Sequence, residues 1–145
     1  MRIEIDLANR TTRKIEKNFL RKIVRGTLTL AELKFAAVKL SLVFVKRAEI
    51  RRLNRIWRGK NQATDVLSFN YSSGYNKKKA SRQSRLEGEI VLSPEIIAKS
   101  AKVNGLCFQD ELAFIFSHGI LHLSGLRHGQ KMYAIQDRVA ALNKK

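Results

Sequence analysis

The first residues of the chain alternate apolar and charged side chains. Ile3, Ile5 and Leu7 are separated by charged residues, which is the two-residue period of a strand with one buried face. Three further segments are rich in β-branched and aromatic residues, which favour strands. They are residues 38–45, 63–71 and 88–93. The pattern therefore predicts a sheet built from strands that precede the longest helices.

Apolar residues at three- and four-residue spacing predict the helices. The first is expected to begin at Thr11 or Thr12, either of which can cap it, and to end at Gly26. The others are predicted at residues 48–59, 94–104, 109–124 and 130–142. Residues 28–35 fit either a short helix or a loop. Strands followed by long helices predict an α+β fold of one domain, residues 1–145, in which helices cover one small mixed sheet.

Two segments are unusual in composition. The helix predicted at 48–59 places four apolar residues on one face and four arginines elsewhere, with Gly59 as its expected end. These residues are Ile50, Leu53, Ile56 and Trp57, and Arg51, Arg52, Arg55 and Arg58. Residues 72–85 are mostly Ser, Gly, Lys and Arg, which cannot bury an apolar face, so a flexible basic loop is expected there.

The charge of the chain indicates its class of partner. The sequence has 29 Lys and Arg against 12 Asp and Glu, a net charge of +17. Each phosphate that a cationic side chain neutralises releases condensed counterions, so such a chain is expected to bind nucleic acid. An acidic membrane surface is the less favoured partner, because no free-standing amphipathic basic helix is evident.

No segment indicates a membrane span or secretion. The apolar runs fall well short of the roughly 20 residues that cross a bilayer, and the N-terminus lacks the apolar core of a secretion signal. The single cysteine, Cys107, agrees with a reducing compartment and is expected to be a small buried residue. A cytoplasmic protein is therefore expected.

All three histidines of the chain fall in one short segment. His118 and His122 are four residues apart, so on a helix they point the same way and can hold one ion between them. Gly125 allows a sharp turn that can return His128 as a third ligand. Three imidazoles with an open fourth position are typical of a catalytic site for zinc or a similar divalent ion.

The spacing of these histidines matches the metzincin pattern H-E-x-x-H-x-x-G-x-x-H at all but one position. Gly119 stands where those peptidases carry their glutamate base. The sequence therefore argues against a peptidase, and either another group manages the protons or a water made acidic by the metal suffices.

Three segments together resemble a known family. They read HGILHLSGLRH (118–128), LNRIWRGKNQATDVLSF (53–69) and GEIVLS (88–93), and in this order they are similar to the YbeY family of bacterial rRNA maturation factors. These are single-strand-specific, metal-dependent endoribonucleases. The resemblance implies a zincin-like fold, one zinc ion on the three histidines, and a role in 16S rRNA 3′-end maturation and ribosome quality control. It also implies ribosomal RNA, a ribosomal subunit or ribosomal proteins as partners.

The resemblance further implies a functional arginine, which in this chain is Arg58. A guanidinium is always charged and can hold a phosphate through two hydrogen bonds while charge builds on it. Candidate RNA-binding residues are Arg55, Lys77, Lys78, Lys79 and Arg127. The segment Thr64–Phe69 is expected to be structural, as an edge strand after a turn.

Two positions depart from the family pattern. Arg127 stands before the third histidine where the family usually has an acidic residue, and Gln136 and Asp137 occupy the region where a glutamate is expected. Arg127 could weaken ion binding if it points inward, or contact a substrate phosphate if it points to the cleft. The alternative function is a non-catalytic factor that binds ribosomal RNA and carries a structural metal.

Overall fold

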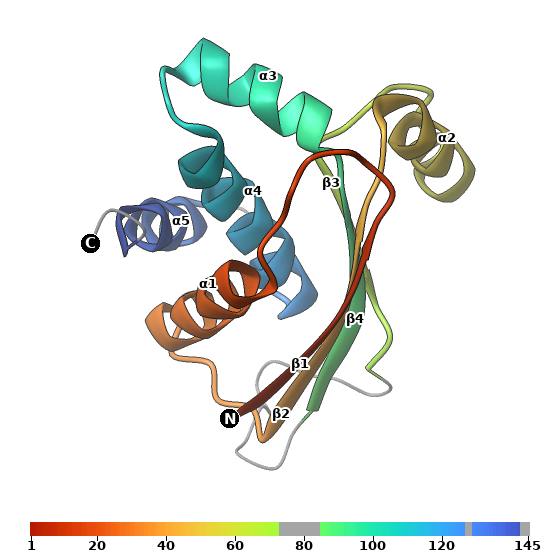
Figure 1. The fold of residues 1–145 in the computed structure, drawn as a ribbon. Helices are drawn as coiled ribbons and strands as arrows, with labels where there is room; N and C mark the ends of the chain where they lie inside the picture. The colour runs from red at the N-terminus through yellow and green to blue at the C-terminus, as the bar shows by residue number, and fades with distance from the viewer. Residues whose placement is uncertain (73–84, 127–128, 143–145) are drawn as a thin grey trace.

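The computed structural model describes residues 1–72, 85–126 and 129–142, which form an α+β fold around one mixed sheet (Figure 1). The strands are β1 (Arg2–Asn9), β2 (Ala37–Phe44), β3 (Val66–Asn70) and β4 (Arg85–Leu92). The helices are α1 (Lys17–Leu30), α2 (Arg47–Arg58), α3 (Pro94–Asn104), α4 (Phe108–Leu123) and α5 (Gln130–Leu142). The predicted α+β class with one mixed sheet is confirmed.

The sheet has the strand order β1-β2-β4-β3, with β1, β2 and β4 parallel and β3 antiparallel at the edge. Side chains along each strand alternate between the two faces. On β4, Ile90 and Leu92 join the main core, whereas Val91 joins a second cluster with Leu67 and Ile50. The two faces of the sheet therefore pack against different helices.

Helix α4 is the central element of the larger layer. It packs against α1, α3 and α5 and against β3 and β4, and Figure 1 shows α1, α4 and α5 together on one side of the sheet. Its sequence is apolar on most faces, and eleven of its residues are buried, as expected for a helix enclosed by others. Helix α2 lies on the opposite side, near one end of the sheet.

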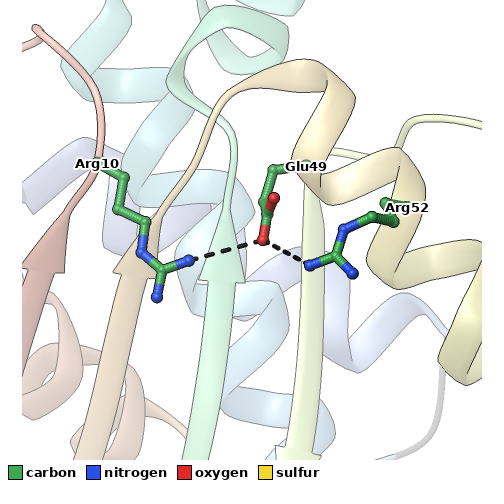
Figure 2. A network of polar contacts seen from close by, with 3 residues as sticks. All are labelled: Arg10, Glu49 and Arg52. Carbon is green, nitrogen blue, oxygen red and sulfur yellow. Dashed lines mark hydrogen bonds and ion pairs between the residues drawn. The ribbon is translucent and has the colours of Figure 1, made fainter.

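Surface ion pairs connect α2 to the end of β1 (Figure 2). Glu49 Oε1 lies 3.6 Å from Arg10 Nη1 and 3.1 Å from Arg52 Nη2. All three side chains are at least partly exposed, and such pairs stabilise by at most about 1 kcal/mol each. The buried residues Ile50 and Leu67 therefore contribute more to holding α2 in place.

The first helix differs from the prediction at both ends. It begins at Lys17, because Thr11 is held in a turn in which its backbone N–H and its hydroxyl both donate to Asn9 Oδ1. It also continues past Gly26 to Leu30. Glycine costs a helix interior about 1 kcal/mol, but Leu28 is fully buried two residues later, and its burial is worth more.

Two smaller predictions also needed correction, and a third lies largely outside the described residues. The last strand begins at Arg85 and not at Gly88, so Arg85 is not part of a loop. Cys107 is exposed at the start of α4, where its sulfur accepts from Asp110 N at 3.4 Å. The basic loop predicted at 72–85 falls mainly on residues 73–84, which lie outside the described residues. No helix in the described ranges is long and apolar enough to span a membrane.

Candidate metal and phosphate site

A cleft of about 710 Å³ opens between the end of α2, the segment leading into β3, and helices α4 and α5. It is lined from α2 by Asn54 and Arg58, from α4 by His118 and His122, and from α5 by Tyr133 and Gln136. All residues from 62 to 68 also line it. Two of the three predicted metal ligands and the predicted catalytic arginine thus share one cavity.

The histidine pair lies on one face of α4, as its four-residue spacing predicts. The ring centroids of His118 and His122 are 4.5 Å apart and the ring planes are inclined by 79°. Both side chains are half-buried, so they border the cleft without being sealed in the core. This spacing lets both imidazoles approach one small ion.

Gln136 orients the first of these rings. It is only 1% exposed, and its Nε2 donates to the carbonyl oxygen of Phe114 at 3.0 Å. Its Oε1 therefore faces His118, with 3.4 Å to Nδ1. Because an amide oxygen only accepts, this contact favours the His118 tautomer protonated on Nδ1, which leaves Nε2 with a lone pair for a metal.

Gly119 has a packing reason to be glycine. A Cβ at this position would lie 3.2 Å from Val66 Cγ2 and 3.4 Å from Ile90 Cγ2, which is tight van der Waals contact. Position 119, between the two histidines, therefore packs closely against the sheet. A larger side chain there would press on the methyl groups of Val66 and Ile90, so glycine suits the close approach of α4 to the sheet.

The end of α4 is fixed by hydrogen bonds that leave a sharp turn. Gly125 has φ +84°, and its N–H donates to His122 O while Leu126 N–H donates to Leu121 O. This is a Schellman end, in which a left-handed glycine reverses the chain. Asn70 of β3 also donates to Leu123 O at 2.7 Å. The turn predicted at Gly125 is confirmed.

The third predicted ligand, His128, and the adjacent Arg127 lie outside the described residues, as do Lys77, Lys78 and Lys79. Among the residues that the structure does describe, no three His, Cys, Asp or Glu side chains are grouped to hold an ion. The three-histidine zinc site therefore stays a prediction, as do the RNA-binding roles of these cations.

Arg58 is held over the edge strand at the mouth of the cleft. Its Nη2 donates to Ser68 O at 2.7 Å, and its Cζ lies 5.1 Å from the centre of the Phe69 ring. The first contact satisfies one donor and the second is a cation–π contact, which leaves further donors of the guanidinium for a ligand. Arg55 is exposed on α2 outside the described lining of the cleft.

Several residues of the site were not predicted from the sequence. Thr64, Asp65 and Ser68 line the cleft, whereas the structural interpretation of this segment was preferred from the sequence, although Asp65 and Ser68 could also have faced a cleft. Asn54 is 4% exposed and its Nδ2 donates to Gln62 O at 2.9 Å, which ties the loop after α2 back onto that helix. A polar residue on the apolar side of a predicted helix was the available signal for Asn54.

Comparison with known proteins identifies the family. The Endoribonuclease YbeY family model matches residues 6–140. Curated relatives with this name include one from Bdellovibrio bacteriovorus, 38% identical over 68% of this chain and 63% of that protein. Another, from Halalkalibacterium halodurans, is 35% identical over 88% of this chain and 84% of its own length. The chain therefore belongs to the endoribonuclease YbeY family, and the resemblance predicted from three segments is confirmed.

The fold has a solved counterpart. The solution structure of a Thermotoga maritima protein superposes with a TM-score of 0.59 at 24% identity, covering 95% of this chain and 86% of that one. At this identity the likeness concerns the fold alone. It supports the α+β prediction. The family match by itself shows that the chain belongs to a family of endoribonucleases, which are hydrolases.

Proposed function

We propose that this protein is a zinc-dependent, single-strand-specific endoribonuclease with a zincin-like site, acting in 16S rRNA 3′-end maturation and ribosome quality control. The observation that carries the proposal is that His118, His122 and Arg58 line one cleft in a chain whose curated relatives are named endoribonucleases. The net charge of +17 supports a polyanionic substrate.

The donor set suits zinc. His118 and His122 supply two imidazoles whose rings are 4.5 Å apart, and His128, three residues after the turn at Gly125, would supply the third. The Gln136 Oε1 atom, 3.4 Å from His118 Nδ1, favours the tautomer that leaves Nε2 for a metal. An ion held there would supply Lewis-acid chemistry, polarising a phosphoryl oxygen and making water more acidic.

Arg58 would hold the scissile phosphate. Its guanidinium lines the same cleft as the histidines, and its contacts with Ser68 O and the Phe69 ring fix the side chain before substrate arrives. A cation fixed in advance stabilises the negative charge that develops on the phosphoryl oxygens without having to reorganise. The half-buried Thr64 and Asp65 line the same cleft and would limit where the RNA strand can lie.

The cleft also accounts for the absence of peptidase chemistry. Gly119 stands between the histidines, where a Cβ would already lie 3.2 Å from Val66 Cγ2, so this position supplies no carboxylate base. In phosphodiester cleavage the nucleophile is either water or the 2′-hydroxyl of the RNA itself. A 5′-phosphate product identifies water, and a 2′,3′-cyclic phosphate identifies the hydroxyl.

The partners proposed with this activity are single-stranded regions of ribosomal RNA and, with them, a ribosomal subunit or ribosomal proteins. A cytoplasmic location is proposed on the same grounds. A high positive charge brings the protein to RNA generally, whereas the cleft selects the strand that is cut.

The test compares wild type with His122→Ala for zinc content and for cleavage of a single-stranded RNA. We expect wild type to hold one zinc ion and to cleave, and the variant to lose both. Cleavage by metal-free His122→Ala would overturn the proposal. Salt-sensitive RNA binding with no cleavage under any divalent ion would instead identify a non-catalytic RNA-binding factor. Hydrolysis of peptides by the wild-type protein would identify a peptidase.

A further inference from the structure

The apolar face predicted for α2 is only half covered. Ile50 is fully buried and Leu53 half-buried, but Ile56 is 53% exposed and Trp57 is 65% exposed. Trp57 is the only tryptophan of the chain. The sheet therefore uses the first part of the apolar stripe and leaves a large aromatic side chain in solvent at its end.

The exposed indole is braced from one side. The ring of Trp57 meets that of Phe69 edge to face, with centroids 6.2 Å apart and planes inclined by 70°. Phe69 is half-buried against α2, so it fixes the indole while most of the indole surface stays accessible. Side chains held this way lose little conformational entropy when a flat ligand stacks on them.

The same phenylalanine connects Trp57 to the cleft. The Arg58 guanidinium lies 5.1 Å above the Phe69 ring and also lines the cavity with His118 and His122. Trp57 and Arg58 thus contact the same ring. A phosphate held by Arg58 places the base of an adjoining nucleotide within reach of the indole.

The charged side chains around Phe69 determine on which side of its ring an RNA strand can run. Glu89 pairs with Phe69 in the β3–β4 register and accepts a hydrogen bond from the Tyr71 hydroxyl at 2.8 Å, which raises the pKa of Tyr71. Glu87 lies on the same face of β4. These carboxylates repel phosphates, whereas α2 carries Arg51 and Arg55 in addition to Arg58. The path toward α2 is therefore favoured.

We propose that Trp57, braced by Phe69, is a stacking subsite for an unpaired base of the RNA next to the phosphate held by Arg58. The inference rests on the proposed function, which supplies RNA as the ligand, and adds how a single strand is recognised. Bases in a duplex are stacked on each other and cannot reach the indole, whereas unpaired bases stack on aromatic side chains regardless of their identity.

Intrinsic fluorescence reports on this subsite alone, because Trp57 is the only tryptophan. Wild-type protein in EDTA, which prevents metal-dependent cleavage, is titrated with a dye-labelled single-stranded RNA oligomer while dye anisotropy follows binding. We expect binding accompanied by quenching of the indole emission. An abasic oligomer with the same number of phosphates, and a duplex of the same RNA, should bind through charge without quenching.

Variants separate stacking from general charge attraction. Trp57→Ala should weaken single-strand binding about tenfold and leave duplex binding unchanged, and Trp57→Phe should recover most of the loss. Val103→Ala, at an exposed apolar position on α3 (86% exposed), is the matched control and should bind as wild type does. Zinc content should be the same in all four proteins.

Two results would overturn the subsite: wild type that binds single-stranded RNA without quenching, or Trp57→Ala that binds it as wild type does. Equal losses for single strands and duplex would also overturn it, since they would indicate a structural role for Trp57. A failure of the proposed function can be told apart from a failure of the subsite. In that case zinc-loaded wild-type protein does not cleave RNA, whatever the fluorescence shows.

Discussion

Replacing Gln136 with leucine tests how the histidines are held. Leucine keeps most of the side-chain volume but removes the donor to Phe114 O at 3.0 Å and the acceptor 3.4 Å from His118 Nδ1. The His118 ring then loses the contact that selects its tautomer. Loss of a partner that orients a metal-ligating histidine typically lowers metal affinity by 10–100-fold, which is about 1.4–2.7 kcal/mol.

Gln136→Leu should lower the free energy of unfolding by less than it lowers the free energy of zinc binding. A neutral hydrogen bond contributes about 1 kcal/mol net, and the longer of these two contributes less. The added apolar burial of leucine offsets part of the loss, because position 136 is almost fully buried. In EDTA, Gln136→Leu should therefore melt only about 3 °C below wild type.

The assay is zinc competition against a chromophoric chelator, with melting temperatures measured in EDTA. Asp137→Asn, at the next and exposed position of α5, is the control and should leave zinc affinity unchanged. Gln136→Glu keeps the acceptor toward His118 and loses the donor toward Phe114, so it should bind zinc more tightly than Gln136→Leu. Zinc affinity of Gln136→Leu within twofold of wild type would refute the orienting role.

Three further substitutions test the packing around the site. Gly88→Ala should lower the free energy of unfolding, measured in urea, by about 1–3 kcal/mol, because its Cβ would lie 2.7 Å from Phe69 O and press on Leu123. The control Gly129→Ala, whose Cβ would have nothing within 4 Å, should change this free energy little. Equal effects of the two substitutions would contradict the packing described for Gly88. Ser93→Ala should leave stability unchanged or raise it, since the buried hydroxyl has no partner among the described residues; a loss of about 1 kcal/mol, usual for a capping serine, would count against this. Gly125→Ala, at φ +84°, should destabilise the protein by about 1 kcal/mol and weaken zinc binding, and unchanged affinity would show that the turn is unimportant.

Local patterns in the sequence were sufficient to predict most of the fold. The alternation at Ile3, Ile5 and Leu7 and the glycines at positions 59 and 105 act through neighbouring residues, so strands and helix ends follow from short windows. The predicted start of α1 at Thr11 or Thr12 was wrong, because the hydroxyl and the N–H of Thr11 both donate to Asn9 instead of capping a helix. The strand order β1-β2-β4-β3 depends on contacts distant in sequence, which periodicity does not contain.

The site was predictable where its residues share one element. The spacing of His118 and His122 places both on one face of α4, and the structure confirms that they share the cleft with Arg58. The role of Gln136 could not be predicted, because it arises from the packing of α5 on α4. The exposure of Trp57 was also not predicted. The helical pattern indicates which face of α2 is apolar, but not where the sheet that covers this face ends.

The most direct test of the central claim, that RNA is cut in the cleft shared by the histidines and Arg58, is the cleavage rate of zinc-loaded Arg58→Ala on single-stranded RNA. Arg52→Ala is the matched control, because it removes the same charge from the same helix at a residue paired with Glu49 (Figure 2). The account predicts that Arg58→Ala keeps its zinc but cleaves about 10²–10³-fold more slowly, while Arg52→Ala cleaves at nearly the wild-type rate. Equal rates for the two variants at equal zinc content would contradict it.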